Sequence, residues 1–457
     1  MRTQNAATHT LKAPHRAGRA RGRKYRMPFF HPEPPYTHGQ PERTAVLLCN
    51  LGTPDEATAP ALRRYLGQFL SDHRVVEIPK LVWMLILHGI ILRVRPAKSA
   101  AKYASVWTPE GSPLAVWTAK QATLLRGWLG EAGHNVLVRH AMRYGNPSIA
   151  SQLDALKAEG ATRILILPLY PQYSGTTTAS VFDAVYTWAA STRNVPELRF
   201  VNRYHDDAGY IEALARTVES HWKENGQPDQ LVMSFHGVPE RTLHLGDPYH
   251  CEARKTGRLL AERLGLREDR YQITFQSRFG KAKWLEPYTQ PTIEALAQKG
   301  TRRVDVICPG FTSDCLETLE EINMEVREAF LHHGGKEFHY IPCLNDTHPW
   351  IGARRAMPMA CCSRLNLFSN VLAGTRLAIC AATVTEQPIA STWPEISACM
   401  ADASSSKRRI SVPSGAALVT ATSWVLARAT PTRTVFRSAA LLMLAPVLPY
   451  STMVAAA

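Results

Sequence analysis

ALKAEGATRILILPLYPQYS, residues 155–174, and ALAQKGTRRVDVICPGFTSD, residues 295–314, follow one pattern. Each begins as the end of an amphipathic helix, turns at a glycine and continues as an apolar run that reaches a proline. Upstream of each lies another matching pair, VLVRHAMRYG at 136–145 and ITFQSRFG at 273–280, where a strand leads to arginine, an aromatic residue and glycine. This long-range repetition predicts two similar domains.

The repeated unit belongs to a longer alternation of apolar runs and helical patterns. Alternating strands and helices predict parallel sheets covered by helices on both faces. We therefore predict the α/β class, with two Rossmann-like, doubly wound domains and a cleft between them where strand ends meet. The predicted strands are 45–51, 136–141, 163–169, 198–202, 231–235, 271–275, 304–308 and 338–341. The predicted helices are 148–159, 178–190, 210–223, 251–264, 289–299 and 316–330.

The alternation divides the chain into four segments. Residues 41–205 and 206–351 are the predicted N-terminal and C-terminal Rossmann-like domains. Residues 1–40 are expected to be a basic, disordered extension; a transit peptide and a start codon placed before a true beginning at Met27 are the alternatives. Residues 352–457 carry no recognisable βα unit, and disorder or a frameshifted reading would explain their composition.

Composition narrows the class of protein. The chain has 457 residues, of which 45% are hydrophobic and 20% charged, as in globular proteins. Its formal net charge of +15 owes much to residues 1–26, which contain no acidic residue, so we predict no nucleic-acid partner. Nine scattered cysteines favour a reducing, cytoplasmic compartment over a disulfide framework.

One apolar segment bears on membranes. LVWMLILHGIILRV, residues 81–94, is too short to span a bilayer, so it predicts either a buried helix or one lying at an interface. Two other segments, 107–118 and 169–178, are predicted as aromatic loops or helix starts beside the cleft, where they would suit a flat, hydrophobic, anionic ligand.

The strongest candidate for chemistry is a histidine at the end of a strand. In LVMSFHGVPER, residues 231–241, an apolar run stops at His236 and turns at Gly237. The carboxyl end of a parallel strand opens into the crevice of such folds. A hydrogen-bonded structural histidine is the alternative.

A row of carboxylates is the second candidate. Glu317, Glu321 and Glu325 recur at every fourth position after the helix start at 312–314, so they share one helical face. Like charges at this spacing repel, which leaves two interpretations. The row is either a solvated acidic face or a hydrated path for a divalent cation.

Several motifs together resemble a known family. They are NLGTP (50–54), YPQYS (170–174), SFHGVP (234–239), GDPY (246–249), QSRFG (276–280) and PGFTSDCLETLEEI (309–322). Through them, residues 45–351 resemble the ferrochelatases, enzymes that insert ferrous iron into protoporphyrin IX in the last step of haem synthesis. The resemblance implies a porphyrin held between two Rossmann-like domains.

The resemblance also implies roles for individual residues. His236 and Glu317 would be the catalytic pair, and the metal would meet His236, Glu317, Glu321 and Glu325. The implied propionate contacts are Arg95, Tyr103, Ser112 and Arg278, and the implied pocket lining is Arg143, Tyr170 and Trp284. Which of His236 and Glu317 takes the proton and which holds the metal stays open.

Further expectations concern cofactors and partners. Fe2+ and protoporphyrin IX are the implied substrates and no cofactor is required; the spacing of Cys361, Cys362, Cys380 and Cys399 predicts no 2Fe–2S cluster. Leu51 stands where members acting on coproporphyrin often carry tyrosine. We expect a cytoplasmic monomer with peripheral membrane contact through segment 81–94. A porphyrin carrier without insertion activity, and a chelatase for another metal or for coproporphyrin, are the alternatives.

Overall fold

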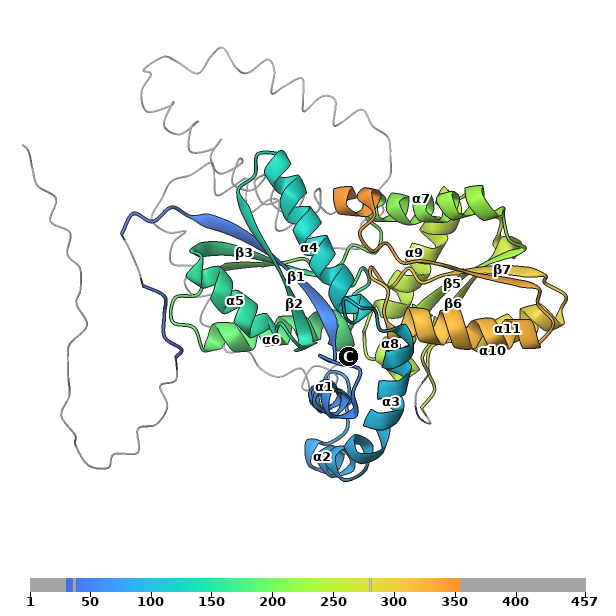
Figure 1. Cartoon of the computed structure of the whole chain (residues 1–457), viewed down its shortest axis with the longest axis horizontal. Coiled ribbons are helices and arrows are strands. Elements are labelled where there is room, and N and C mark those ends of the chain that lie inside the picture. Colours follow the sequence, from blue (N-terminus) through green and yellow to red (C-terminus); the bar gives the residue numbers. More distant parts are fainter. Residues whose placement is uncertain (1–29, 36–37, 279, 281, 354–457) are drawn as a thin grey trace, which may run out of the picture. The chain divides into compact units, whose positions relative to one another are not determined.

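The computed structural model describes residues 30–35, 38–278, 280 and 282–353. These residues form two four-stranded sheets with parallel pairing, in the orders β2-β1-β3-β4 and β6-β5-β7-β8. The strands are β1 (Arg43–Thr53), β2 (Val136–Gly145), β3 (Ala161–Pro168), β4 (Glu197–Phe200), β5 (Gln230–His236), β6 (Tyr271–Gln276), β7 (Arg303–Ile307) and β8 (Glu337–Ile341). The predicted α/β class and all eight predicted strands are confirmed, with shifts of a few residues at their ends (Figure 1).

The helices follow most strands, as the alternation predicts. The α-helices are α1 (Ala59–Ser71), α2 (Lys80–Ile86), α3 (Leu92–Val106), α4 (Pro113–Glu131), α5 (Ile149–Ala158), α6 (Ser180–Ala190), α7 (Ala208–Asn225), α8 (Glu240–His244), α9 (Tyr249–Arg263), α10 (Thr289–Gln298) and α11 (Arg327–His332). Three π-helical segments, η1 (Leu87–Ile91), η2 (Gly175–Ala179) and η4 (Glu317–Val326), and a 3-10 turn, η3 (Glu268–Arg270), complete the described elements.

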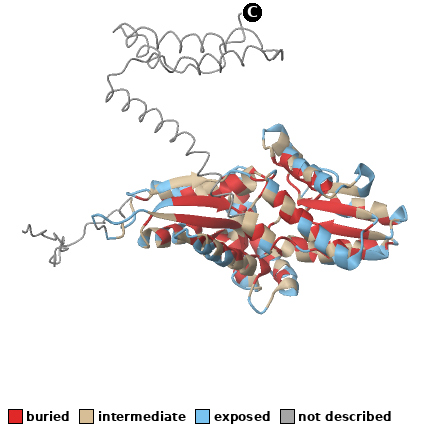
Figure 2. Cartoon of the chain, turned by 90° about the horizontal axis from the view of Figure 1, so that it is seen from above, coloured by how far each residue is buried: buried red, intermediate tan, exposed pale blue. Residues whose placement is uncertain are grey.

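Helices cover both faces of the first sheet. Alternate residues of β1 point to opposite faces, so both sets of side chains are buried. Val46 and Leu48 pack with Leu125 of α4, in the cluster on one face. Leu47 and Cys49 pack with α5 and α6 on the other. Figure 2 shows these strands almost wholly buried. Such double coverage explains why the strands appear in the sequence as continuous apolar runs.

The second sheet repeats this arrangement. Met233 and Phe235 of β5 face the cluster that includes α7 and α9, whereas Val232 faces Ile293 of α10 and Ile322 of η4. Figure 1 shows α7 and α9 on one side of this sheet and α10 and α11 on the other. Both halves are therefore doubly wound.

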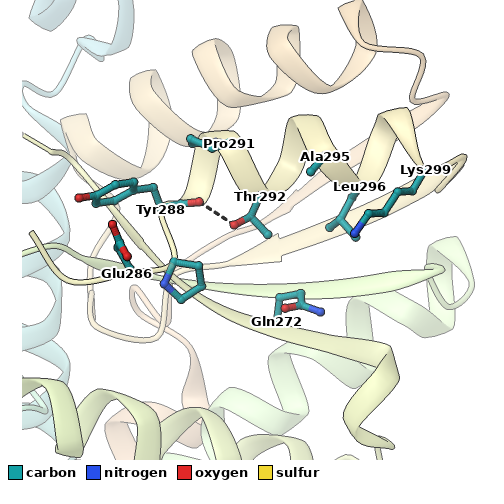
Figure 3. A pocket seen from close by; sticks show the side chains of 9 residues that line it. Gln272, Glu286, Tyr288, Pro291, Thr292, Ala295, Leu296 and Lys299 are labelled. Atoms are coloured by element: carbon teal, nitrogen blue, oxygen red, sulfur yellow. Dashed lines mark hydrogen bonds between the residues drawn. The ribbon is translucent and has the colours of Figure 1, made fainter.

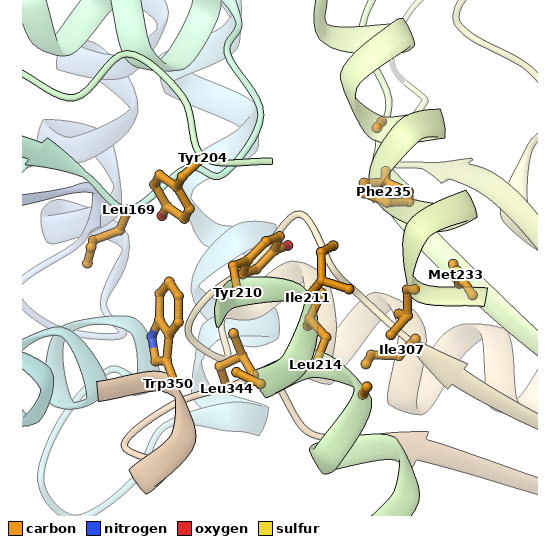
Figure 4. Packing of buried hydrophobic residues seen from close by; sticks show 14 of the residues in the cluster. Leu169, Tyr204, Tyr210, Ile211, Leu214, Met233, Phe235, Ile307, Leu344 and Trp350 are labelled. Carbon is orange, nitrogen blue, oxygen red and sulfur yellow. The ribbon is translucent and has the colours of Figure 1, made fainter. Parts of the chain in front are cut away.

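The two halves share a hydrophobic core. One continuous cluster of buried residues includes Leu48 of the first sheet and Met233 of the second. Trp350 is fully buried in it and lies 6.0 Å, ring to ring, from Tyr204 and 5.8 Å from Tyr210 (Figure 4). The chain therefore returns, after its last strand, to the junction where it crossed from one half to the other.

One loop prediction needs correction, for residues 107–118, and the helix start predicted within 169–178 is confirmed. Residues 107–118 are a loop only as far as Ser112, because Pro113 occupies the first turn of α4, where its missing amide proton costs nothing. Residues 169–178 end within the π-helical η2, whose N-cap Ser174 accepts a hydrogen bond from the Thr176 amide.

Segment 81–94 is buried on one face and exposed on the other. It runs through α2, η1 and the start of α3; Leu87 and Leu92 are buried, whereas Leu81 is 85% and Leu85 77% exposed. The segment is thus a buried helix on one face and an uncovered apolar surface on the other. Among the described residues, no helix has the length and apolarity needed to cross a bilayer.

The ends of the chain lie largely outside the described residues. Part of the predicted extension is described, and there Glu33 accepts hydrogen bonds from the backbone amides of Arg193 and Asn194, at 2.8 and 2.9 Å. Residues 30–35 therefore have defined contacts with the body, because one carboxylate satisfies two amides. Residues 348–353 are helical, and the predictions for the tail beyond them concern residues outside the described part.

Candidate active site

His236 lies at the carboxyl end of β5 and is half-buried. Its Nδ1 lies 2.6 Å from the carbonyl oxygen of Gly237. A carbonyl can only accept, so Nδ1 carries the proton and, in the neutral ring, Nε2 keeps its lone pair. The hydroxyl of Tyr249 donates to the His236 carbonyl at 2.8 Å, which fixes the strand end from which the ring projects. The site therefore presents a basic ring nitrogen.

Gly237 allows this turn because a side chain would not fit. A Cβ there would lie 2.7 Å from the carbonyl oxygen of Gln276 and 3.1 Å from the ring of Trp284. The Gly237 amide donates to the Gln276 carbonyl at 2.7 Å. Trp284 thus packs directly against the turn that follows His236.

Glu317, through its backbone, and Glu321, through its carboxylate, contact the end of β6. The backbone carbonyl of Glu317 accepts from Gln276 Nε2 at 2.9 Å. The carboxylate of Glu321 accepts from the amide and the hydroxyl of Ser277, at 2.7 and 2.6 Å. Burial raises the pKa of Glu321 and the nearby Glu317 adds to this, whereas Ser277 and His236 oppose it. The structure therefore groups His236, Glu317 and Glu321.

These carboxylates lie on η4, a π-helical segment of ten residues. Wide π-helical turns are rare and occur often at functional sites. The third predicted carboxylate, Glu325, is 2.8 Å from Lys102 Nζ of α3, and Lys102 also holds Glu320 at 2.9 Å. Glu325 is therefore tied by an ion pair to the first half of the chain.

Tyr103, in the first half of the chain, lies near Glu317. Burial raises the pKa of Tyr103 strongly, and Tyr65 and the carboxylate of Glu317 add to it. Ser112, at the N-cap of α4, is buried and accepts a hydrogen bond from Thr53 Oγ1 at 2.7 Å. Tyr103, a predicted propionate contact, therefore lies near Glu317, a member of the predicted catalytic pair.

Arg143 is engaged within the protein. Its Nη2 lies 2.6 Å from Asp72 Oδ2, and its Nε donates to the carbonyl and hydroxyl of Ser180. Burial alone would raise the pKa of Asp72, but hydrogen bonds from Ser180, the Arg74 amide and Tyr144, with the charge of Arg143, bring this pKa below its ordinary value. Arg143 thereby fixes the end of α1 against β2.

The other predicted lining residues differ in their surroundings. The buried hydroxyl of Tyr170 and the buried Nε1 of Trp284 have no hydrogen-bond partner among the described residues. Arg278 is exposed, with its guanidinium 5.1 Å from the ring centre of Tyr288. Arg95 lies on α3, about 12 Å along the helix before Tyr103, and burial lowers its pKa.

Two hollows on the described surface lie elsewhere. The larger, of about 650 Å³, is lined by residues of β6 and α10 and the loop between them, including Glu286 and Tyr288 (Figure 3). The smaller, of about 140 Å³, lies beside Thr53, Tyr65 and Gly145. His236 and Glu317 line neither hollow.

Comparison with known proteins identifies the family. The model of the family described as "Ferrochelatase" matches residues 43–357. The chain belongs to the ferrochelatase family. A ferrochelatase of Polaromonas sp. is 74% identical over 328 residues, 71% of this chain and 89% of the relative. A ferrochelatase of Methylibium petroleiphilum is 74% identical over 322 residues, 70% of this chain and 89% of the relative. SirB from Bacillus subtilis, solved with Fe3+, aligns over 68% of this chain and 92% of its own, at 13% identity and a TM-score of 0.40.

Membership of the ferrochelatase family confirms the resemblance drawn from the motifs. Sequence reasoning nevertheless missed residues that hold the site. Gln276 and Ser277 stand in the quoted motif QSRFG, yet only its arginine was selected. No sequence pattern indicates the roles of Lys102 and Asp72. Lys102 pairs with Glu320, 218 positions away, and Asp72 pairs with Arg143, 71 positions away.

Proposed function

We propose that this member of the ferrochelatase family inserts ferrous iron into protoporphyrin IX to form protohaem. Its family membership supports iron insertion into a porphyrin. The observation that carries the assignment of residues is the hydrogen bond from His236 Nδ1 to the Gly237 carbonyl. It leaves Nε2 as a proton acceptor in the same group as the carboxylates of Glu317 and Glu321.

The reaction needs such a group. A free-base porphyrin loses two pyrrole N–H protons when one Fe2+ ion bonds to its four nitrogens. We assign the first proton to His236 Nε2, because that nitrogen is the free base of the group, and the second to solvent water. We assign metal delivery to Glu317 and Glu321, because carboxylate oxygens can replace the water of a hydrated divalent ion. No cofactor and no 2Fe–2S cluster are proposed.

The porphyrin itself would be held by aromatic rings and by cations. Trp284 and Tyr170 offer flat surfaces with buried polar atoms that lack partners among the described residues. Arg278 and Arg95 are the proposed propionate partners, because guanidinium binds carboxylate bidentately. Arg143 already holds Asp72, so we assign it to the pocket wall and not to a propionate.

We also propose that the protein works as a cytoplasmic monomer that rests on a membrane surface. The exposed apolar side chains on and just before α2 and η1 are Ile78, Leu81, Val82, Leu85, Ile86 and Ile90. Lys80 and Arg93 are exposed beside them, an arrangement typical of interfacial helices on anionic lipid. A hydrophobic porphyrin could be collected from the bilayer there.

Anaerobic insertion assays test the central assignment. His236→Ala should lower the initial rate of haem formation about a hundredfold to ten-thousandfold, the usual worth of acid–base help. Porphyrin binding, followed by fluorescence, should persist because aromatic area and propionate contacts stay. His244→Ala, an exposed histidine of α8, is the matched control. Near-normal turnover of His236→Ala would refute the assignment.

The same assays separate the alternatives. A porphyrin carrier would bind protoporphyrin but form no haem with the unaltered chain. A chelatase for another metal or for coproporphyrin would show a higher kcat/KM with that metal or porphyrin in direct competition.

A further inference from the structure

A second cluster of metal-ligating side chains lies among residues that the proposed reaction does not use. It consists of His221 of α7, Asp305 of β7 and His339 of β8, whose ligand atoms lie within 4.8 Å of one another. We propose that His221, Asp305 and His339 bind one divalent transition-metal ion such as Zn2+, separately from the site at His236.

The spacing of the ligand atoms fits one ion. His221 Nε2 lies 3.2 Å from His339 Nδ1 and 3.5 Å from Asp305 Oδ2. In a tetrahedral zinc site, bonds of about 2.0–2.1 Å place neighbouring ligand atoms roughly 3.3–3.4 Å apart. Two of the three separations already lie near this value, and the third, between Asp305 and His339, is within 4.8 Å.

The fold places these residues on one face. Asp305 and His339 are register partners in the parallel pair of β7 and β8, so their side chains point to the same side of the sheet. His221 reaches them from the last part of α7, the helix that covers this side. Two strands and a helix thus fix the donors, and rigid elements hold a metal site better than loops do.

The chemical state of the cluster suits a cation. Asp305 is fully buried, and His221 and His339 are partly buried beside it. Two imidazoles and one buried carboxylate form a ligand set common to zinc sites.

Arg303 and Trp222 both hold the Asp305 carboxylate, Trp222 by donating from Nε1 to Oδ2 at 3.0 Å, and a metal ion must displace Arg303 in part. The Nε of Arg303 donates to Asp305 Oδ1 at 3.0 Å, and its Nη2 lies 3.2 Å from Asp305 Oδ2 and 3.5 Å from His339 Nδ1. The same Nη2 also donates to the Gly226 carbonyl at 2.9 Å. A metal on Oδ2 would leave Nε on Oδ1 and Nη2 on Gly226. Arg303 would then orient the ligating carboxylate, as partners behind metal ligands commonly do.

Cobalt binding to the full chain without porphyrin tests the proposal, because tetrahedral Co2+ has intense visible bands. We expect one such ion per chain, at least tenfold weaker binding in His221→Ala and in His339→Ala, and no change in His332→Ala, an exposed histidine of α11. The bands should persist in His236→Ala, which separates this site from the proposed active site.

Thermal unfolding gives a second readout that does not depend on colour. Zn2+ should raise the unfolding temperature of the unaltered chain and of His332→Ala, and this increase should shrink in His221→Ala and His339→Ala. Circular dichroism checks that both variants fold. Cobalt bands and zinc stabilisation that survive in both folded variants, or that vanish in His236→Ala alone, would overturn the proposal and leave the cluster as a hydrogen-bonded network.

Discussion

Ser277 combines an unusual backbone with a role at the site. Its φ of +66° lies in the left-handed region that residues with a side chain seldom adopt. The carboxylate of Glu321 stabilises this unfavourable backbone conformation by accepting hydrogen bonds from both the amide and the hydroxyl of Ser277. One carboxylate therefore has two separable roles: to hold the turn before Arg278, and to carry charge beside His236.

A pair of substitutions separates these roles. Glu321→Gln should leave haem formation within about tenfold of normal but raise the apparent KM for iron, because it removes a charge that guides the cation. Ser277→Ala keeps that charge and should leave this KM unchanged. Initial rates at several iron concentrations measure both. An equal rise in KM in the two variants would instead assign Glu321 to holding the turn.

At this scale, sequence reasoning selected residues that the fold brings together, His236, Glu317 and Glu321, but not their partners. His236 was selected because it ends an apolar strand before a glycine turn, and the motif SFHGVP favoured a catalytic role over a structural histidine. Glu317 and Glu321 were predictable from their spacing and the family motif. The pairing of Glu325 with Lys102 was not, because it joins residues from different halves that only the tertiary fold brings together.

The strand β1 depends on one glycine near its end. Gly52 has a φ of +110°, and a Cβ there would lie 1.7 Å from the carbonyl oxygen of Tyr144 on β2. Gly52→Ala should therefore lower the free energy of unfolding by about 2–5 kcal/mol. Gly67→Ala, on α1, is the control, because the new methyl would contact only Leu92, at 3.6 Å. The higher helix propensity of alanine should raise the free energy of unfolding of this variant by about 0.5–1 kcal/mol. Denaturant unfolding that finds the two variants alike would contradict this account.

The helix α2 carries the prediction about membranes. Leu81→Glu with Leu85→Glu should weaken binding to anionic phospholipid vesicles at least about tenfold, since each leucine would lose about 1.5–3 kcal/mol of burial. Leu245→Glu, also a highly exposed leucine, should bind normally. Sedimentation with vesicles measures this. Unchanged sedimentation of the double variant would exclude α2 as the contact.

Elements were predicted where periodicity is strong and missed where tertiary contacts decide. The eight strands and six helices predicted all exist, because buried parallel strands leave continuous apolar runs. The start of α4 was missed, since the aromatic residues of 107–118 hid the Ser112–Pro113 helix start. The π-helical form of η4 has no sequence signal, because the same spacing fits an ordinary α-helix.

The whole described body should unfold as one unit because its core crosses both halves. Trp350 is fully buried at the junction, so Trp350→Ala should lower the free energy of unfolding by about 3–5 kcal/mol. A chain that ends at residue 357, where the family match ends, should keep full insertion activity, whereas one that ends at 347 should lose it. Separate unfolding transitions for the two sheets would contradict a shared core.

The two copies of the repeated unit differ at one equivalent position. Cys49 pairs with Ala141, and His236 pairs with Gln276, each partner lying two residues before the arginine of its copy. Burial raises the pKa of the Cys49 thiol, so this position holds an unreactive thiol in the first copy, whereas in the second it holds a ring nitrogen with a free lone pair. The two copies thus share a backbone arrangement but carry side chains of different chemistry at this position. Of these two equivalent positions, only the one in the second copy offers a proton acceptor, so a planar molecule lying between the copies would have two chemically unequal faces at this position.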